Sequence, residues 1–141
     1  MVYLVLIIIV LFDQWFKILI ERGFNPGQSI PVIEDYFHLT YVRNTGAAFG
    51  LFQDNNFILI VFSMLVIVFF IFFIKYQAPD SIAAKISTGL IIGGALGNII
   101  DRIRLGFVID YLDFQVWPVF NLADTAIVIG AIMLIIVFLR E

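Results

Sequence analysis

Four long apolar runs alternate with shorter polar segments along the 141-residue chain. A helix rises about 1.5 Å per residue, so roughly 20 apolar residues cross the ~30 Å hydrocarbon core of a bilayer. The pattern therefore predicts one polytopic membrane domain over residues 1–141, mainly α-helical, with four transmembrane helices. The predicted helices cover about residues 2–21, 57–75, 82–103 and 119–139.

The longest polar connection covers residues 23–56, and glycine and proline residues interrupt any helix in its first part. Residues 37–43 alternate between apolar and polar side chains, as a strand does. Residues 47–52 are small and apolar, which favours a short interfacial helix. We therefore expect a small β-sheet followed by that helix, and residues 107–114 form a further strand-like stretch.

The amino-acid composition excludes several classes of function. Hydrophobic residues make up 62% of the chain and charged residues 13%, which is typical of an integral membrane protein. Cysteine is absent, so disulfides, a thiol nucleophile and thiolate metal ligands are excluded. His38 is the single histidine and is interpreted as a surface strand residue, so neither a zinc centre nor a cofactor is expected. A net charge of −3 offers no basic surface for nucleic acid.

Two polar residues stand at the head of the last apolar run. Asn121 and Asp124 are three residues apart and so share one face of a helix. Asp124 lies only about 6 Å inside the run, where a carboxylate costs ~3 kcal/mol on insertion scales. Capping of the helix N-terminus explains Asn121, but the pattern places Asp124 a full turn too deep to cap. A functional role for Asp124 is therefore favoured.

Charged residues also occur in two other apolar runs. Asp13 and Lys17 are four apart and face each other on the first predicted helix, either as a simple ion pair at the membrane edge or as part of a site. Asn98 and Arg102 share a face of the third, which Gly94 continues one turn deeper.

Small residues mark the third run as different from the second. Gly89, Gly93 and Gly97 form two overlapping G-x-x-x-G spacings, which let another backbone approach closely. Two interpretations stay open for them: packing of helices within one subunit, or assembly of a non-enzymatic helix bundle from several.

Asp110 in the strand-like stretch is the natural partner of Asp124. With four crossings, the 23–56 loop and the 104–118 connection share one membrane face, so the two carboxylates lie at the same face. Two carboxylates in a partly dry site share a proton, so one can take a proton from water while the other donates to a carbonyl. Such a pair hydrolyses an amide without a metal or a covalent intermediate. Proton relays and ion sites use the same groups, which leaves a proton- or ion-coupled carrier as the alternative.

Five sequence blocks, in order, resemble bacterial lipoprotein signal peptidase (signal peptidase II) over essentially the whole chain. The blocks are Asp13-Gln14-Trp15-Phe16-Lys17, Asn44-Thr45-Gly46-Ala47-Ala48-Phe49, Gly93-Gly94-Ala95-Leu96-Gly97-Asn98-Ile99-Ile100-Asp101-Arg102, Val108-Ile109-Asp110-Tyr111 and Phe120-Asn121-Leu122-Ala123-Asp124.

The resemblance implies a four-helix aspartyl endopeptidase of the bacterial cytoplasmic (inner) membrane. It implies that both termini are cytoplasmic, that the sheet is extracytoplasmic and that the active site faces the outer leaflet. The enzyme would remove signal peptides from prolipoproteins by cutting before a diacylglyceryl-modified Cys. Prolipoproteins and membrane lipid would be its partners, and globomycin-type cyclic peptides its inhibitors.

Carried onto this chain, the resemblance makes Asp110 and Asp124 the catalytic dyad and Asp13 and Lys17 a supporting pair. Further residues match positions that line the family's site: Asn44, Gly46, Asn98, Arg102, Asn121 and Ala123. Two features depart from the family. Tyr111 stands where Phe is commoner and adds a hydroxyl, and the chain stops at Glu141 without the basic tail of many relatives.

Overall fold

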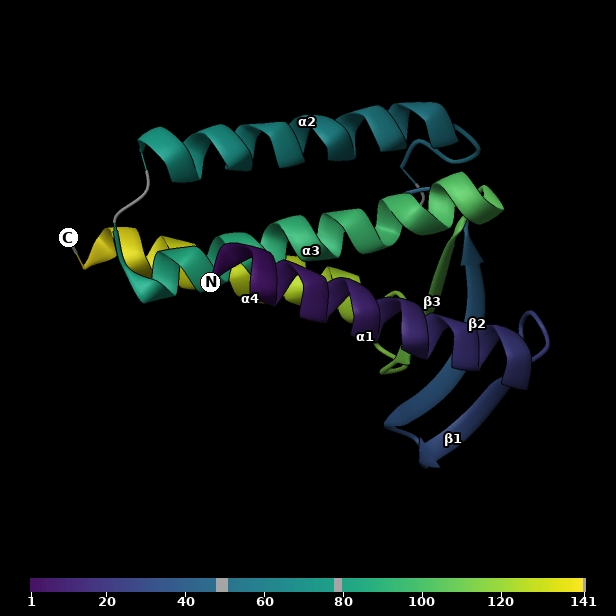
Figure 1. Ribbon diagram of the computed structural model, residues 1–141. Coiled ribbons are helices and arrows are strands. Elements are labelled where there is room, and N and C mark those ends of the chain that lie inside the picture. Colours follow the sequence, from purple (N-terminus) through teal and green to yellow (C-terminus); the bar gives the residue numbers. More distant parts are fainter. Residues whose placement is uncertain (48–50, 78–79, 141) are drawn as a thin grey trace.

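The computed structural model describes residues 1–47, 51–77 and 80–140. Within this part the helices lie side by side and the sheet caps one end of the bundle, with both chain termini toward the other end (Figure 1). Four of these helices are long and apolar enough to cross a membrane, so the predicted fold class is confirmed. The elements are α1 (Val2–Gly23), β1 (Ser29–Ile33), β2 (Phe37–Asn44), α2 (Asn56–Tyr76), α3 (Ile82–Leu105), β3 (Val108–Asp113) and α4 (Leu122–Leu139).

Helix α3 lies at the centre and packs against the three other helices. Its glycines permit this: a Cβ at Gly93 would lie 3.1 Å from the Leu6 carbonyl oxygen of α1, and one at Gly94 would lie 2.3 Å from the Ala123 carbonyl oxygen of α4. The spacing noted in the sequence therefore serves close packing within one chain. At its end, Gly106 adopts φ 83°, a left-handed conformation that lets the chain leave the helix and enter β3.

The sheet is antiparallel in the order β1-β2-β3. The β2–β3 register pairs Asn44 with Val108 and Val42 with Asp110, so the two strands carry site residues to the same region. Strand β1 lies in the first part of the 23–56 loop, for which the sequence predicted only that helix is interrupted. Pro31 is tolerated because β1 is an edge strand, where a missing N–H breaks no internal ladder.

Helix α4 begins three residues later than the sequence suggested, at Leu122 instead of about 119. Phe120 pairs with Leu112 in an antiparallel bridge, so the chain stays extended up to Asn121. Pro118 therefore precedes the helix. The interfacial helix predicted for residues 47–52 falls largely on residues 48–50, outside the described part, while residues 51–54 form turns.

A small core joins the sheet to the helices. Ile20 of α1 packs with Tyr41 of β2 and with Ile109 and Tyr111 of β3. Burial raises the pKa of the Tyr111 hydroxyl above its usual range, although a hydrogen bond from the Leu122 backbone N–H acts against that shift. Because Ile109 and Tyr111 flank Asp110, this core fixes the strand that carries the carboxylate.

Candidate active site

A cavity of about 1050 Å³ lies between strands β2 and β3 and helices α2, α3 and α4. It is mostly apolar on the α2 and α4 sides and polar where α3 meets the sheet. Its polar wall includes six of the residues selected from the sequence: Asn44, Gly46, Asn98, Arg102, Asp110 and Asp124.

Asp110 projects from β3 into this cavity and is only 2% exposed. Each of its oxygens accepts a hydrogen bond: Oδ2 from Asn44 Nδ2 at 2.9 Å and Oδ1 from Asn121 Nδ2 at 2.7 Å. The pKa of Asp110 is raised to about 7, mainly by burial and to a lesser extent by the neighbouring carboxylate of Asp124. Its side chain can therefore hold a proton near neutral pH.

Asp124 lies in the first turn of α4 and takes part in the cap, so the prediction that it is too deep to do so was wrong. Asn121 is the N-cap: its Oδ1 accepts from the Asp124 N–H at 2.9 Å, and Asp124 Oδ2 accepts from the Asn121 N–H at 3.3 Å. The reason is the late start of the helix, which makes Asp124 its third residue. The other oxygen, Oδ1, accepts from Asn98 Nδ2 at 2.8 Å.

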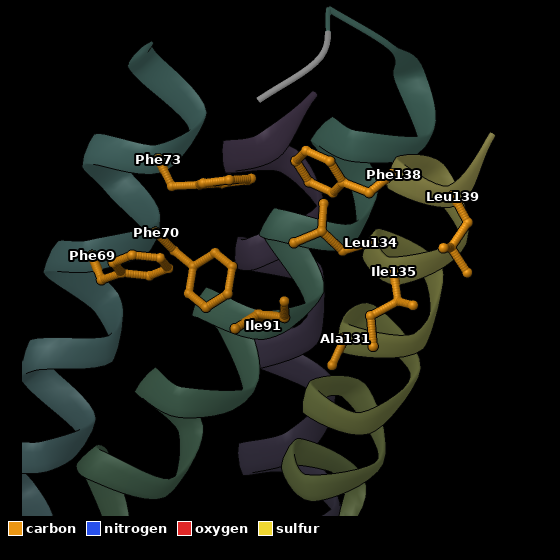
Figure 2. Close-up of a pocket in the computed structure, with 9 residues that line it drawn as sticks. All are labelled: Phe69, Phe70, Phe73, Ile91, Ala131, Leu134, Ile135, Phe138 and Leu139. Carbon is orange, nitrogen blue, oxygen red and sulfur yellow. The ribbon is translucent and has the colours of Figure 1, made fainter. Parts of the chain in front are cut away.

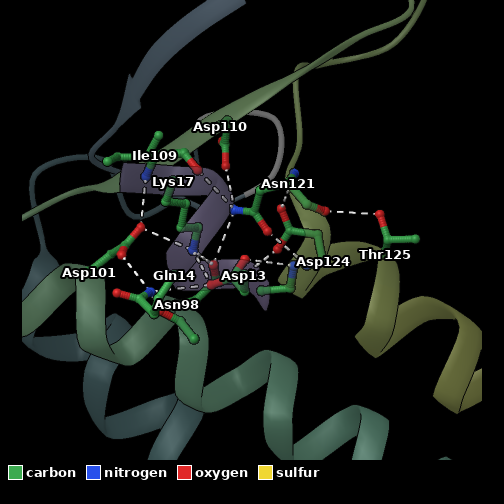
Figure 3. Close-up of polar contacts among 12 residues, drawn as sticks. Asp13, Gln14, Lys17, Asn98, Asp101, Ile109, Asp110, Asn121, Asp124 and Thr125 are labelled. Atoms are coloured by element: carbon green, nitrogen blue, oxygen red, sulfur yellow. Dashed lines mark hydrogen bonds and ion pairs between the residues drawn. The ribbon is translucent and has the colours of Figure 1, made fainter. Parts of the chain in front are cut away.

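The fully buried Asn121 amide connects the two carboxylates (Figure 3). Its Nδ2 donates to Asp110 Oδ1 and lies 3.1 Å from Asn98 Oδ1, while its Oδ1 caps Asp124. One side chain between Asp110 and Asp124 therefore ties β3, α3 and α4 together.

Lys17 and Asp13 are completely buried, so their pair is not an isolated ion pair at the membrane edge. Lys17 Nζ lies 2.9 Å from Asp13 Oδ2 and donates to Asn98 Oδ1 at 3.0 Å. Neither residue lines the cavity; both stand behind it. Ala123 is also fully buried and outside the cavity lining, with its N–H donating to Asp13 Oδ1 at 3.0 Å.

Arg102 binds the backbone of the loop that follows β2. Its Nη2 donates to the Gly46 carbonyl at 2.6 Å, and Asn56 Nδ2 donates to the Arg102 carbonyl at 3.0 Å. The Gly46 N–H in turn donates to Asn44 Oδ1 at 2.9 Å, which orients the amide that binds Asp110. Asn44, Gly46 and Arg102 thus form one connected wall of the cavity.

Two further residues of the network were missed in the sequence. Asp101 is completely buried; it lies 3.0 Å from Lys17 Nζ and accepts from the Ile109 N–H at 3.0 Å. Gln14 Nε2 donates to Asp101 Oδ1 at 2.9 Å. Both residues lie in sequence blocks that resemble the family. Asp101 could have been selected as a site residue because it is a carboxylate within an apolar run.

The opposite end of the bundle holds a second, smaller cavity of about 400 Å³ (Figure 2). Its lining is entirely apolar and comes from α2, α3 and α4. The residues are Phe69, Phe70, Phe73, Ile91, Ala131, Leu134, Ile135, Phe138 and Leu139. It carries no group that can transfer a proton. Among residues 1–47, 51–77 and 80–140, no group of three or more His, Asp or Glu side chains is arranged to hold a metal ion.

Comparison with known proteins agrees with this geometry. Residues 5–140 match the family described as signal peptidase (SPase) II. The lipoprotein signal peptidase of Halothermothrix orenii is 53% identical over 96% of this chain and 93% of the relative. That of Moorella thermoacetica is 47% identical over 95% of this chain and 90% of its own length.

Solved structures show the same fold. A bacterial membrane enzyme determined by the in meso method at 2.3 Å aligns with a TM-score of 0.93 and 31% identity, over 99% of this chain and 87% of that one. A second bacterial membrane enzyme, determined at 1.9 Å, gives 0.90 and 30%, over 99% and 93% of the two chains. The chain belongs to the signal peptidase II family.

Proposed function

We propose that this protein is a lipoprotein signal peptidase that works as an aspartic endopeptidase, with Asp110 and Asp124 as its catalytic pair. The observation that carries the proposal is the shared environment of the two carboxylates. They line one cavity and are bridged by the buried amide of Asn121. In this chain no cysteine is available as a nucleophile, and a carboxylate pair that shares one proton supplies both the base and the acid for amide hydrolysis.

We assign the proton to Asp110, whose side chain is almost fully buried and whose pKa is raised to about 7 by burial and by the neighbouring Asp124 carboxylate. Asp124, ionised, takes a proton from a water molecule, and the hydroxide oxygen bonds to the scissile carbonyl carbon. Asp110 gives its proton to the carbonyl oxygen, which yields a neutral tetrahedral diol. As the C–N bond breaks, Asp124 returns its proton to the leaving nitrogen and Asp110 regains one from a diol hydroxyl. Both side chains end in their starting states.

The cavity also supports a lipid-modified substrate. Phe62 and Ser63 of α2 and Thr125 and Val128 of α4 line one side of it, and these helices otherwise present large apolar side chains to the membrane. In the proposed complex the acyl chains leave the cavity between α2 and α4 and stay in the bilayer, where each buried methylene is already worth about 0.8 kcal/mol. We propose that cleavage occurs before a diacylglyceryl Cys held in this way, and that globomycin-type cyclic peptides compete for the same cavity.

Substrate specificity follows from the polar wall. The residue before the lipidated Cys would lie against Gly46 and Asn98, where small side chains fit. Gly, Ala or Ser is expected at that position, and Leu or Phe is expected to be cut poorly. The orientation that fits such a substrate places the sheet at the outer leaflet of the bacterial cytoplasmic membrane and both termini in the cytoplasm.

The decisive experiment incubates purified protein with one preprolipoprotein in lipidated and unlipidated forms and determines the cut site by mass spectrometry. We expect cleavage directly before the lipidated Cys, and far slower cleavage without the lipid. Asp110→Asn and Asp124→Asn should each fall below about 10⁻³ of the parental rate, the scale of lost acid–base catalysis. Asp113→Asn, three positions along the same strand, is the matched control and should retain activity. Substantial cleavage by either dyad variant would remove the mechanism, and equal rates on both substrates would remove the lipid specificity.

A further inference from the structure

Two buried carboxylates hold the backbone immediately before each residue of the proposed dyad. Asp13 Oδ1 accepts from the Ala123 N–H at 3.0 Å, one residue before Asp124. Asp101 Oδ2 accepts from the Ile109 N–H at 3.0 Å, one residue before Asp110. The two contacts are equivalent in position, although one is made from α1 to α4 and the other from α3 to β3.

Lys17 joins these two carboxylates. Its Nζ lies 2.9 Å from Asp13 Oδ2 and 3.0 Å from Asp101 Oδ2, and all three side chains are fully buried. The remaining donor goes to Asn98 Oδ1 at 3.0 Å. An ammonium has three N–H donors, so the group is fully used. Because Asn98 Oδ1 is engaged, its Nδ2 is directed at Asp124.

The arrangement has little room to shift. Gln14 Nε2 donates to Asp101 Oδ1 at 2.9 Å and to the Gly97 carbonyl at 3.1 Å. A Cβ at Gly97 would lie 2.5 Å from Asp13 Oδ2, so only glycine leaves space for that carboxylate. In the part of the chain that the structure describes, every buried side-chain nitrogen and oxygen has a hydrogen-bond partner.

Stability alone does not account for such a group, because a buried charge cluster is often no more stabilising than apolar side chains of the same volume. Its residues also stay out of the cavity lining, so they cannot touch substrate. The cluster of Asp13, Lys17 and Asp101 instead defines the relative position of residues 109 and 123. A small displacement of a catalytic pair lowers the reaction rate by a large factor.

We propose that Asp13, Lys17 and Asp101 form a positioning clamp, which sets the separation of Asp110 and Asp124 by fixing the backbone before each of them. Asp101 is thereby assigned a role as a positioning residue. The proposal rests on the proposed function, since it concerns the geometry of that dyad. It differs from a merely structural role in predicting a loss of rate in folded enzyme with unchanged substrate binding.

A double-mutant cycle tests the clamp. Asp13→Asn and Asp101→Asn each keep an oxygen for the backbone N–H but weaken the bridge through Lys17. Each should lower kcat per folded enzyme about 100-fold, the scale of a misplacement near 1 Å, with KM within about twofold of the parent. The double variant should be no more than about threefold worse than the poorer single variant, because the bridge is already open. Glu21→Gln is the matched control on α1, where the partner Arg104 lies 3.2 Å away at the surface.

Asp101→Glu provides a second test of the clamp if the Asn variants fold poorly. It keeps the charge and the ion pair but moves the carboxylate by one methylene, so the clamp predicts a loss of kcat of about tenfold at unchanged KM. Parental kcat in folded Asp101→Glu, or effects of the two Asn variants that multiply, would overturn the clamp. Asp110→Asn is assayed in parallel: activity there removes the dyad and the clamp together, whereas its loss beside parental clamp variants removes the clamp alone.

Discussion

The two ends of the helix bundle are built from the same three helices and differ in almost every chemical respect. At the end near the termini, α2, α3 and α4 enclose a cavity with a wholly apolar lining. At the sheet end, the same helices enclose a cavity whose wall carries Asn98, Arg102 and Asp124. Helix α3 contributes to both, through Ile91 at one end and Asn98 at the other.

The difference shows what the sheet contributes. Helices satisfy their own backbone groups, so packed helices offer few free backbone donors and acceptors to a polar side chain between them. The N–H of Ile109 in β3 donates to Asp101 of α3, and the carbonyl of Gly46 in the loop before α2 accepts from Arg102 of α3, while Asn44 of β2 donates to Asp110 of β3. The free-energy cost of burying charged side chains on α3 is lowered because the backbone groups of Ile109 and Gly46 form hydrogen bonds with them. Changes at the sheet end should therefore be far more harmful than equal changes at the other end.

Outside the proposed dyad, a large effect is expected from adding one methyl group at Gly94. A Cβ there would lie 2.3 Å from the Ala123 carbonyl oxygen, so the start of α4 must move and carry Asp124 with it. We expect Gly94→Ala to lose more than about 100-fold in kcat/KM. Gly23→Ala is the matched control, because no atom lies within 4 Å of the added Cβ. Thermal unfolding and cleavage assays on both variants measure the contrast, and near-parental activity of Gly94→Ala would break it.

A second effect follows from pH. The mechanism needs one proton on the pair, and the pKa of Asp110 is raised to about 7 by burial and then by the charge of Asp124. Cleavage should therefore fall about tenfold per pH unit well above pH 7. A pH–rate profile of kcat/KM measures this; a flat profile to pH 9 would exclude a protonated Asp110 as the acid.

The same shift makes a stability prediction of definite sign. The pKa of Asp110 is higher in the folded protein than the value of about 4 of an unfolded chain. The folded state therefore binds the extra proton, and its stabilisation is complete below about pH 4 and declines as the pH rises to 7. Asp110→Asn cannot ionise, so its unfolding temperature should exceed that of the parent at pH 8 by more than at pH 5. Equal differences at both pH values would contradict the shift.

The sequence was sufficient to predict the four helices and to bring Asp110 and Asp124 to the same end of the bundle, where both line one cavity, but it did not reveal the network around them. Hydrophobic runs reveal membrane helices because lipid selects apolar side chains over a fixed length. The site depends on contacts between residues far apart in the chain: Ala123 with Asp13, and Gln14 with Asp101. No local spacing encodes such pairs.

Helix capping shows the same limit on a smaller scale. Asn121 and Asp124 were recognised as neighbours on one face, yet the cap depended on where the helix begins. That point is set by the bridge between Phe120 and Leu112. A strand contact outside the helix thus decides the role of a residue within it.

A smaller effect is expected at Arg102. Its Nη2 donates to the Gly46 carbonyl at 2.6 Å while Nη1 lies 3.3 Å from Asn56 Oδ1. Lysine lacks the planar fork that reaches two acceptors from two separate nitrogens. We expect Arg102→Lys to lower kcat/KM about tenfold, the effect of one lost charged hydrogen bond. Arg104→Lys, on the same helix but at the surface, should stay within about twofold because an exposed ion pair contributes little. A similar loss in both variants would show that the wall formed by Arg102 has no special role.

The smallest effect should come from filling the apolar end. Ala131 lines the cavity there, and Ala131→Leu adds methylene groups to a space of about 400 Å³. In detergent this should raise the unfolding temperature slightly, since each buried methylene contributes up to about 0.8 kcal/mol. In a bilayer the gain should shrink, because lipid chains are as apolar as the side chain that replaces them. Cleavage should stay within about twofold of the parent in both media, because the altered residue touches neither Asp110 nor Asp124. A loss of more than about tenfold at unchanged stability would mean that the apolar end takes part in binding the signal peptide, and the contrast between the two ends would then be one of chemistry alone and not of function.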